Sequence, residues 1–175
     1  AGTYTNCYKL TGAPVCGDNV TSLVWTYSNC SKLTGSPVCK NEVIDMSGAY
    51  YNCSNLTSSP VCGNNVTNMA WTYYNCNKLI GSAACGDKVT DMTGTYQYCN
   101  NITTAVCGSS VTNMAWTYCD CSDLTGAPIC GPNVTNMYWT YYNCPNLYGD
   151  MYVHSDNVSS ADYCFEGRNI SNQLN

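Results

Sequence analysis

The chain has 175 residues, of which only 10% are charged, and a formal net charge of −5 at pH 7, whereas soluble domains are usually about a quarter charged. Six basic residues against eleven acidic ones do not supply the positive surface that a phosphate backbone requires, so no nucleic-acid partner is expected. No apolar run approaches the roughly 18 residues of a membrane span, so no membrane insertion is expected.

Fifteen cysteines dominate the composition, and thirteen of them recur at steps of 23 or 22 residues. The first series is Cys7, Cys30, Cys53, Cys76, Cys99, Cys121 and Cys144, and the second is Cys16, Cys39, Cys62, Cys85, Cys107 and Cys130. An odd number of thiols cannot all pair within one chain, and a repeated column offers no unique pairing. We therefore expect two structural ladders of buried free thiols in a repeat protein. Cys119 and Cys164 lie outside both series.

One repeat unit, followed in chain order, contains three predicted elements. Val61–Cys62 begins with a β-branched residue and follows a proline, which predicts a short parallel strand. The same holds for Val15–Cys16 and Val38–Cys39. Gly63–Asn65 predicts a turn. Apolar residues across Val66–Cys76 keep the spacing of one helix face, which predicts a short helix or 3₁₀ segment. Such a short unit cannot bury its apolar face alone, so we expect successive units to stack as coils about 4.8 Å apart.

Over the first five coils glycine and tryptophan alternate at one position of the repeat, two residues before a tyrosine column. The series is Gly2, Trp25, Gly48, Trp71, Gly94, Trp116, Trp139 and Tyr163. Indoles are too large to lie side by side in every coil at a spacing of about 4.8 Å. We therefore expect each glycine to provide the space that the neighbouring indole occupies.

An aromatic–x–x–Cys–x–x–Leu motif stands at Tyr50–Leu56, Tyr73–Leu79, Tyr96–Ile102 and Tyr141–Leu147. In this motif and its period the chain resembles the BspA-like leucine-rich repeats, a family of Cys/Tyr-rich repeats of bacterial or phage surface proteins. The resemblance implies a solenoid: a leucine-rich-repeat-like right-handed coil with short parallel β-strands and short helical or 3₁₀ return segments. A parallel β-helix is the alternative fold class.

The repeat pattern also predicts how the chain is divided. Residues 1–147 are expected to form about six 23-residue repeats, and residues 148–175 a divergent C-terminal repeat or partial cap. Because the array starts in the middle of a unit, we expect the chain to be a fragment of a longer polypeptide.

Candidate residues for chemistry are few. Zinc sites use close pairs such as C-x₂₋₄-C, and only Cys119 and Cys121 are close in sequence. His154 is followed by Ser155 and Asp156, but no nucleophile motif such as G-x-S-x-G accompanies it. The sequence therefore predicts no enzyme, no metal and no cofactor.

Tyrosines outside the tyrosine column vary between coils and are the best functional signal, because variable positions on a repeat scaffold form its partner surface. The predicted binding surface is Tyr8, Tyr51, Tyr74, Tyr98, Tyr138, Tyr142, Tyr148 and Tyr152. With Asn and Thr nearby, it predicts a non-catalytic binding or adhesion module for a protein or carbohydrate on a cell surface. The alternative is a structural spacer or fibre segment of a larger surface or virion protein, with possible end-to-end self-association. The resemblance implies a cell-surface, extracellular or virion-associated location.

Overall fold

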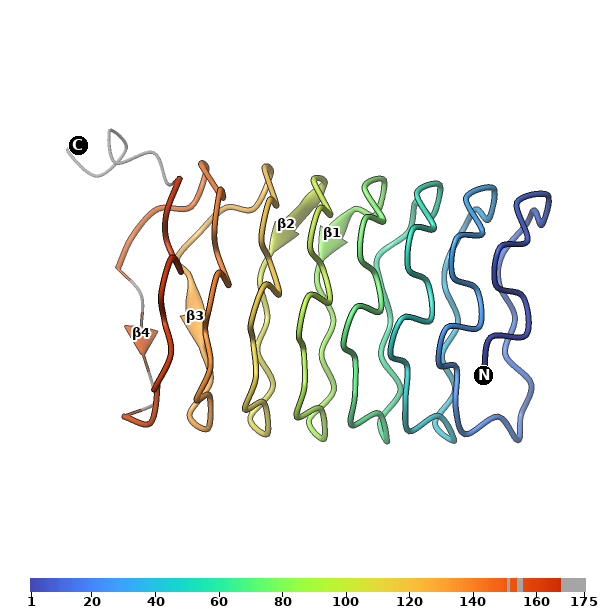
Figure 1. Ribbon diagram of the computed structural model, residues 1–175, viewed down its shortest axis with the longest axis horizontal. Helices are drawn as coiled ribbons and strands as arrows, with labels where there is room; N and C mark the ends of the chain where they lie inside the picture. Colours follow the sequence, from blue (N-terminus) through green and yellow to red (C-terminus); the bar gives the residue numbers. More distant parts are fainter. Residues whose placement is uncertain (151, 154–155, 168–175) are drawn as a thin grey trace.

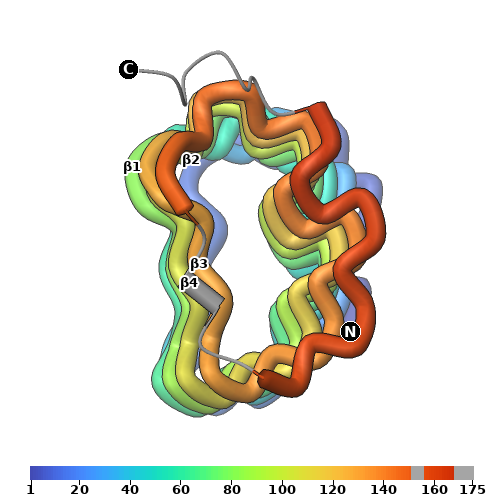
Figure 2. Tube along the Cα trace, turned by 90° about the vertical axis from the view of Figure 1, so that its left-hand side faces the viewer, coloured from blue at the N-terminus to red at the C-terminus, as the bar shows by residue number. Residues whose placement is uncertain are grey.

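The chain winds into successive coils that stack along one axis in the computed structural model (Figures 1 and 2). The structure describes residues 1–150, 152–153 and 156–167. Each coil has two long walls, which face each other in Figure 2. We call them the turn wall, formed by residues 66–76 and their equivalents, and the strand wall, formed by residues 79–85 and their equivalents.

Hydrogen bonding between coils is parallel and short. On the strand wall, β1 (Gly81–Ser82) pairs with β2 (Ile102–Thr104), and β3 (Ile129–Cys130) pairs with β4 (Tyr152–Val153). A longer series of single parallel bridges runs along the stack where the turn wall begins, through Ser22, Asp45, Asn68, Asp91, Asn113, Asn136 and Ser160. The repeat step therefore sets the register between coils.

The helical return segments predicted for the turn wall are wrong, because the described residues contain no helix. In the expected helix Val66–Cys76, the Thr72 amide donates to Met69 O at 3.0 Å, and the Cys76 amide donates to Tyr73 O at 3.0 Å. The amides of Trp71, Tyr73 and Asn75 donate to the next coil instead, as from Trp71 to Thr93 O at 2.7 Å. An α-helix would direct each amide to the carbonyl four residues earlier in the same segment, and a 3₁₀ helix would direct each one to the carbonyl three residues earlier; here every second amide leaves the segment. The wall is therefore a succession of tight turns fastened to the neighbouring coil.

Left-handed backbone recurs at two positions of these turns. Trp71 has φ 58° and Asn75 has φ 54°, as the third residue of a type II turn requires. Asparagine tolerates this conformation, and Asn52 and Asn29 adopt it one and two coils earlier, with φ 58° and 59°. Their side chains form a ladder, in which Asn75 Nδ2 donates to Asn52 Oδ1 at 3.0 Å. This geometry explains the asparagine before the cysteine of the first series.

A stack of tyrosine rings fills the interior between the two walls. Tyr50, Tyr73 and Tyr96 are fully buried, and neighbouring ring centroids lie 5.5 Å apart with nearly parallel planes. Each phenol crosses the coil to the strand wall, where Tyr73 Oη donates to Val61 O at 2.7 Å. The rings supply apolar contact and their hydroxyls satisfy backbone that faces the core.

The strands predicted at Val15–Cys16, Val38–Cys39 and Val61–Cys62 are wrong, because none of these pairs is a strand and none has a backbone hydrogen bond to a neighbouring coil in the described part of the chain. The three valine carbonyls accept from Tyr27, Tyr50 and Tyr73 at 2.6, 3.0 and 2.7 Å. The equivalent Ile129–Cys130 does form a strand, β3, although Ile129 O accepts the same kind of hydrogen bond, from Tyr141 at 2.7 Å. The tyrosine bond is therefore compatible with both conformations, and pairing with the neighbouring coil is what distinguishes β3.

All fifteen cysteines are free thiols in the structure. In the first series each thiol from Cys30 onward donates to a tyrosine carbonyl of the preceding coil, as from Cys76 to Tyr50 O and from Cys99 to Tyr73 O, both at 3.0 Å. The second series lies by the strand wall and is buried or half-buried. Cys164 occupies the column of buried threonines that includes Thr140, and Cys119 stands in the column of Tyr51 and Tyr74.

The phenol of Tyr96 is expected to stabilise the coil through two backbone groups at once. Its oxygen donates to Ala84 O at 2.7 Å and accepts from the Ala84 amide at 2.8 Å. We expect Tyr96→Phe to lower the free energy of unfolding by about 1–2 kcal/mol, because both groups lose a partner in a half-buried place. Urea unfolding measures the loss. Tyr4→Phe is the control, since Tyr4 continues the same stack at a position that is 43% exposed, and an equal loss there would contradict the argument.

Candidate ligand-binding groove

Two tryptophans lie flat on glycines of the following coil. A Cβ atom built on Gly48 would be 2.3 Å from Trp25 Cε3, and 2.5 Å from both Cδ2 and Cζ3. The same construction on Gly94 gives 2.2 Å to Trp71 Cε3 and 2.3 Å to Cζ3. Several atoms of one ring at nearly equal distances mean that the indole face, and not its edge, covers the glycine. The opposite faces of these two indoles therefore point away from the coil.

Tyrosines form a row beside these indoles. Tyr51 and Tyr74 are stacked on each other, with ring centroids 4.4 Å apart and planes within 5°. Each meets a tryptophan edge to face, with Trp25 5.5 Å from Tyr51 and Trp71 5.8 Å from Tyr74. Such pairs are favoured by the aromatic quadrupole, so the indoles and the phenol rings hold one another in place.

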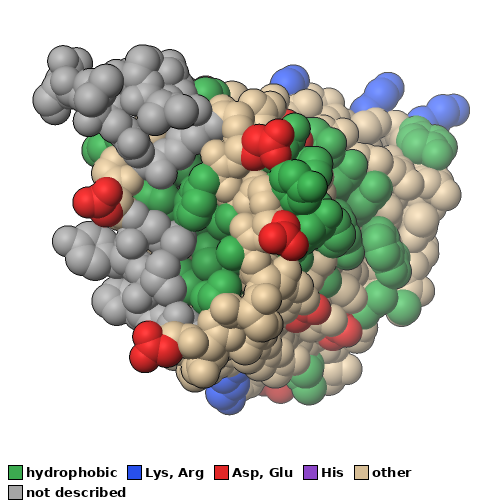
Figure 3. Space-filling view, turned by 60° about the vertical axis from the view of Figure 1, so that its left-hand side comes forward, with side chains coloured by type: hydrophobic (Ala, Val, Ile, Leu, Met, Phe, Trp, Pro, Cys, Tyr) green, Lys and Arg blue, Asp and Glu red, His purple; other side chains and the backbone are tan. Residues whose placement is uncertain are grey.

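The ring contacts continue along the stack. Trp71 lies 6.1 Å from Trp116, and Trp116 meets Tyr138 at 5.4 Å. Trp139 then stacks on Tyr142 at 4.1 Å. We call the connected set the aromatic strip: Trp25, Tyr51, Trp71, Tyr74, Tyr98, Trp116, Tyr138, Trp139, Tyr142 and Tyr163. Figure 3 shows apolar side chains gathered on the molecular surface, with basic side chains at its upper and lower margins.

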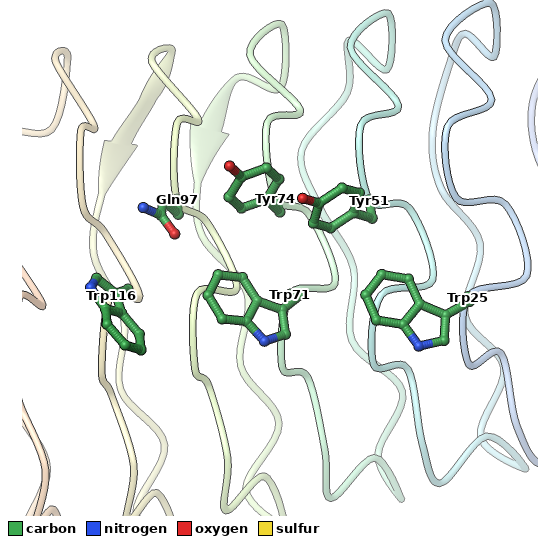
Figure 4. A pocket seen from close by; sticks show the side chains of 6 residues that line it. All are labelled: Trp25, Tyr51, Trp71, Tyr74, Gln97 and Trp116. Atoms are coloured by element: carbon green, nitrogen blue, oxygen red, sulfur yellow. The ribbon is translucent and has the colours of Figure 1, made fainter. Parts of the chain in front are cut away.

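The first part of the strip forms an open groove of about 470 Å³. Six residues line it: Trp25, Tyr51, Trp71, Tyr74, Gln97 and Trp116. Figure 4 shows the three indoles in one row and Tyr51, Tyr74 and Gln97 in a second row beside them. Burial, together with the neighbouring Tyr51 and Tyr98, raises the pKa of Tyr74 to about 12. The lining is therefore uncharged at neutral pH.

The predicted binding residues whose side chains the structure describes separate into two groups. Tyr51, Tyr74, Tyr98, Tyr138 and Tyr142 belong to the aromatic strip. Tyr8 and Tyr148 are 58% and 55% exposed, and no ring contact joins either to the strip within the described part of the chain. Tyr152 contributes backbone to β4, but its side chain is outside the described residues.

Sequence reasoning assigned the tryptophans a packing role and omitted them from the binding surface. The Gly/Trp alternation was the signal that could have pointed to them. An indole that covers the glycine of the next coil at the molecular surface turns its other face toward the solvent. Gln97 was omitted because it replaces a tyrosine in the column of Tyr51 and Tyr74.

The deeply buried thiols have an environment unsuited to nucleophilic chemistry. Burial raises the pKa of Cys53, Cys99 and Cys144 to about 12, and the thiolate is the reactive form. Burial and the hydrogen bond to the Asp120 carboxylate raise the pKa of Cys119 further.

Within the ranges that the structure describes, no three His, Cys, Asp or Glu side chains gather as metal ligands. No helix in these ranges is long and apolar enough to cross a bilayer. His154 and Ser155, the remaining catalytic candidates beside Asp156, fall outside the described residues.

Comparison with known proteins found no relative: no family model, no curated protein and no solved structure matches the chain. Its class is given by architecture alone, as a stack of coils that carries an aromatic groove. The likeness to BspA-like repeats therefore stays a prediction.

Proposed function

We propose that the chain is a non-catalytic binding module whose partner, a glycan or a protein, occupies the groove beside Trp25 and Trp71. The observation that carries the proposal is the pair of indoles laid flat on Gly48 and Gly94 with one face turned outward. Trp25 remains 41% exposed, although burying an indole would stabilise the chain by a few kcal/mol. A connected aromatic surface of this kind is typical of interaction sites.

The rigidity of the groove supports the same proposal. Trp25 and Trp71 are each fixed between a glycine below and a tyrosine beside it, and the backbone beneath Trp71 is fastened to the neighbouring coil by its amide, which donates to Thr93 O at 2.7 Å. Side chains that are already ordered lose little conformational entropy when a partner binds. The groove therefore retains most of the free energy of its contacts as affinity.

The proposal includes the cell-surface, extracellular or virion-associated location that the repeat resemblance implies, because adhesion modules act there. A structural spacer remains the competing function. Ladders that repeat from coil to coil would serve a spacer equally well, but a spacer needs no ordered aromatic groove.

Alanine substitutions in and outside the strip test the proposal. We expect Trp71→Ala and Tyr74→Ala to weaken binding to a glycan array or to intact cells by about tenfold or more, as truncation of central aromatic contacts does. Tyr8→Ala and Tyr148→Ala are matched controls, because both residues are exposed tyrosines outside the strip. Equal binding by all four variants and the parent chain would contradict the proposal.

A further inference from the structure

The groove has the shape and polarity of a site for one class of ligand. Resting on the proposed function, we infer that the partner is an uncharged, linear β-1,4-linked polysaccharide. Its extended chain lies along the stack axis and places every second sugar on an indole, the first on Trp25 and the next on Trp71. The inference follows from the exposed faces, their repeat distance and the polar row beside them.

The exposed faces select for sugar rings. The C–H groups on one side of a pyranose carry partial positive charge, and the indole face carries the negative part of its quadrupole. A flat sugar can therefore cover the outward face of Trp25 or Trp71 as the glycine of the next coil covers the inward face. An indole presented by its edge would not offer this contact.

The repeat distance selects for an extended β-1,4 chain. Trp25 and Trp71 stand two coils apart, which is roughly 10 Å at about 4.8 Å for each coil. This matches the length of a disaccharide in a flat β-1,4-linked chain, where alternate sugars present the same face. An α-1,4-linked chain coils, and it cannot keep two such faces on a straight row.

The second row of the groove suits the hydroxyl groups of such a chain. The hydroxyls of Tyr51 and Tyr74 and the amide of Gln97 lie beside the indole row (Figure 4). The phenol of Tyr74 is protonated at neutral pH, as any tyrosine of ordinary pKa is, so it can donate to a sugar oxygen. The lining contains no cation to bind a uronate or sulfate group, and the chain has a net charge of −5.

A proline-rich peptide is the competing partner, because such peptides also dock on aromatic grooves. They insert proline rings into slots between neighbouring aromatic side chains. Tyr51 and Tyr74 are stacked at 4.4 Å and leave no slot between them. The geometry therefore favours the polysaccharide.

Calorimetry and tryptophan fluorescence with defined probes test the inference on the full chain. We expect cellohexaose or mannohexaose to bind, and maltohexaose, polygalacturonate and a polyproline peptide to bind at least about tenfold more weakly. Affinity should rise about tenfold between a β-1,4 disaccharide and a tetrasaccharide, because only the longer chain covers both indoles. Trp25→Ala should remove this increase, whereas Tyr148→Ala should preserve it.

The outcomes distinguish the ligand class from the binding role. Failure of every β-1,4 oligosaccharide to bind, or equal binding of maltohexaose or polyproline, overturns the inference. The proposed function survives that result if Trp71→Ala still weakens binding to the array or to cells. An affinity that is independent of oligosaccharide length also overturns it, because the two-indole arrangement requires a length step.

Discussion

Raising the pH above about 9 is expected to unfold the protein cooperatively, because its buried thiols ionise more readily in the unfolded chain. The pKa values of Cys53, Cys99 and Cys144 are raised to about 12 in the fold by burial, and all three are fully buried. Between an ordinary thiol pKa and this raised value, the unfolded state binds fewer protons than the folded state. Stability is therefore complete below about pH 8 and falls as the pH rises.

The expected loss is large because the thiols act together. Each contributes about 1.4 kcal/mol for each pH unit, so these three lower the free energy of unfolding by about 4 kcal/mol for each unit. Domains are stable by about 5–15 kcal/mol, so we expect the midpoint between about pH 10 and pH 12. Circular dichroism during an alkaline titration, with thiolate absorbance recorded in parallel, measures both events.

A single serine provides the control for this pH dependence. Cys99→Ser retains a donor for Tyr73 O, which now accepts from the thiol at 3.0 Å, but its hydroxyl does not titrate in this range. The dependence of unfolding free energy on pH should become shallower by about 1.4 kcal/mol for each unit. A stability that stays constant between about pH 8 and pH 10 would show that the thiols are not buried as described.

Gly94→Ala is expected to lower the free energy of unfolding by about 3 kcal/mol, for two reasons. About 1 kcal/mol comes from a side chain at positive φ, since Gly94 has φ 57°. The remainder comes from overpacking, because the new Cβ would lie 2.2 Å from Trp71 Cε3. Urea unfolding measures the loss, and tryptophan fluorescence reports the displaced indole.

Two variants separate these causes. Gly126 has φ 85° and nothing within 4 Å of an added Cβ, so Gly126→Ala reports backbone strain alone. In a Trp71→Ala background, Gly94→Ala should cost only about 1 kcal/mol, because the clash is absent and the two substitutions are coupled. Equal losses in both backgrounds would disprove the shared-space argument.

Periodicity in the sequence was sufficient to identify what is repeated. The cysteine series, the tyrosine column and the Gly/Trp alternation all follow from a step of 23 residues, and each occupies one continuous line in the structure. Stacking identical units forces equivalent residues to meet, so the column arrangement needs no knowledge of backbone conformation. Burial of Val66, Met69, Tyr73 and Cys76 was correct, although the helix assigned to them was wrong.

Backbone conformation and the site were decided by contacts between coils. Apolar spacing cannot distinguish one helix face from a series of turns. The turns form because amides such as that of Trp71 donate to the next coil, here to Thr93 O, and not within their own segment. The strands predicted at Val15, Val38 and Val61 are likewise absent because no backbone hydrogen bond joins these residues to a neighbouring coil in the described part of the chain.

The sequence by itself thus determined the period, the core columns and the space shared by indole and glycine. Only the tertiary structure determined that Trp25 and Trp71 present their outer faces in one groove beside Tyr51 and Tyr74. The physical reason is that a repeat fixes which residues are neighbours, whereas the direction of each side chain depends on hydrogen bonds and ring contacts with adjacent coils.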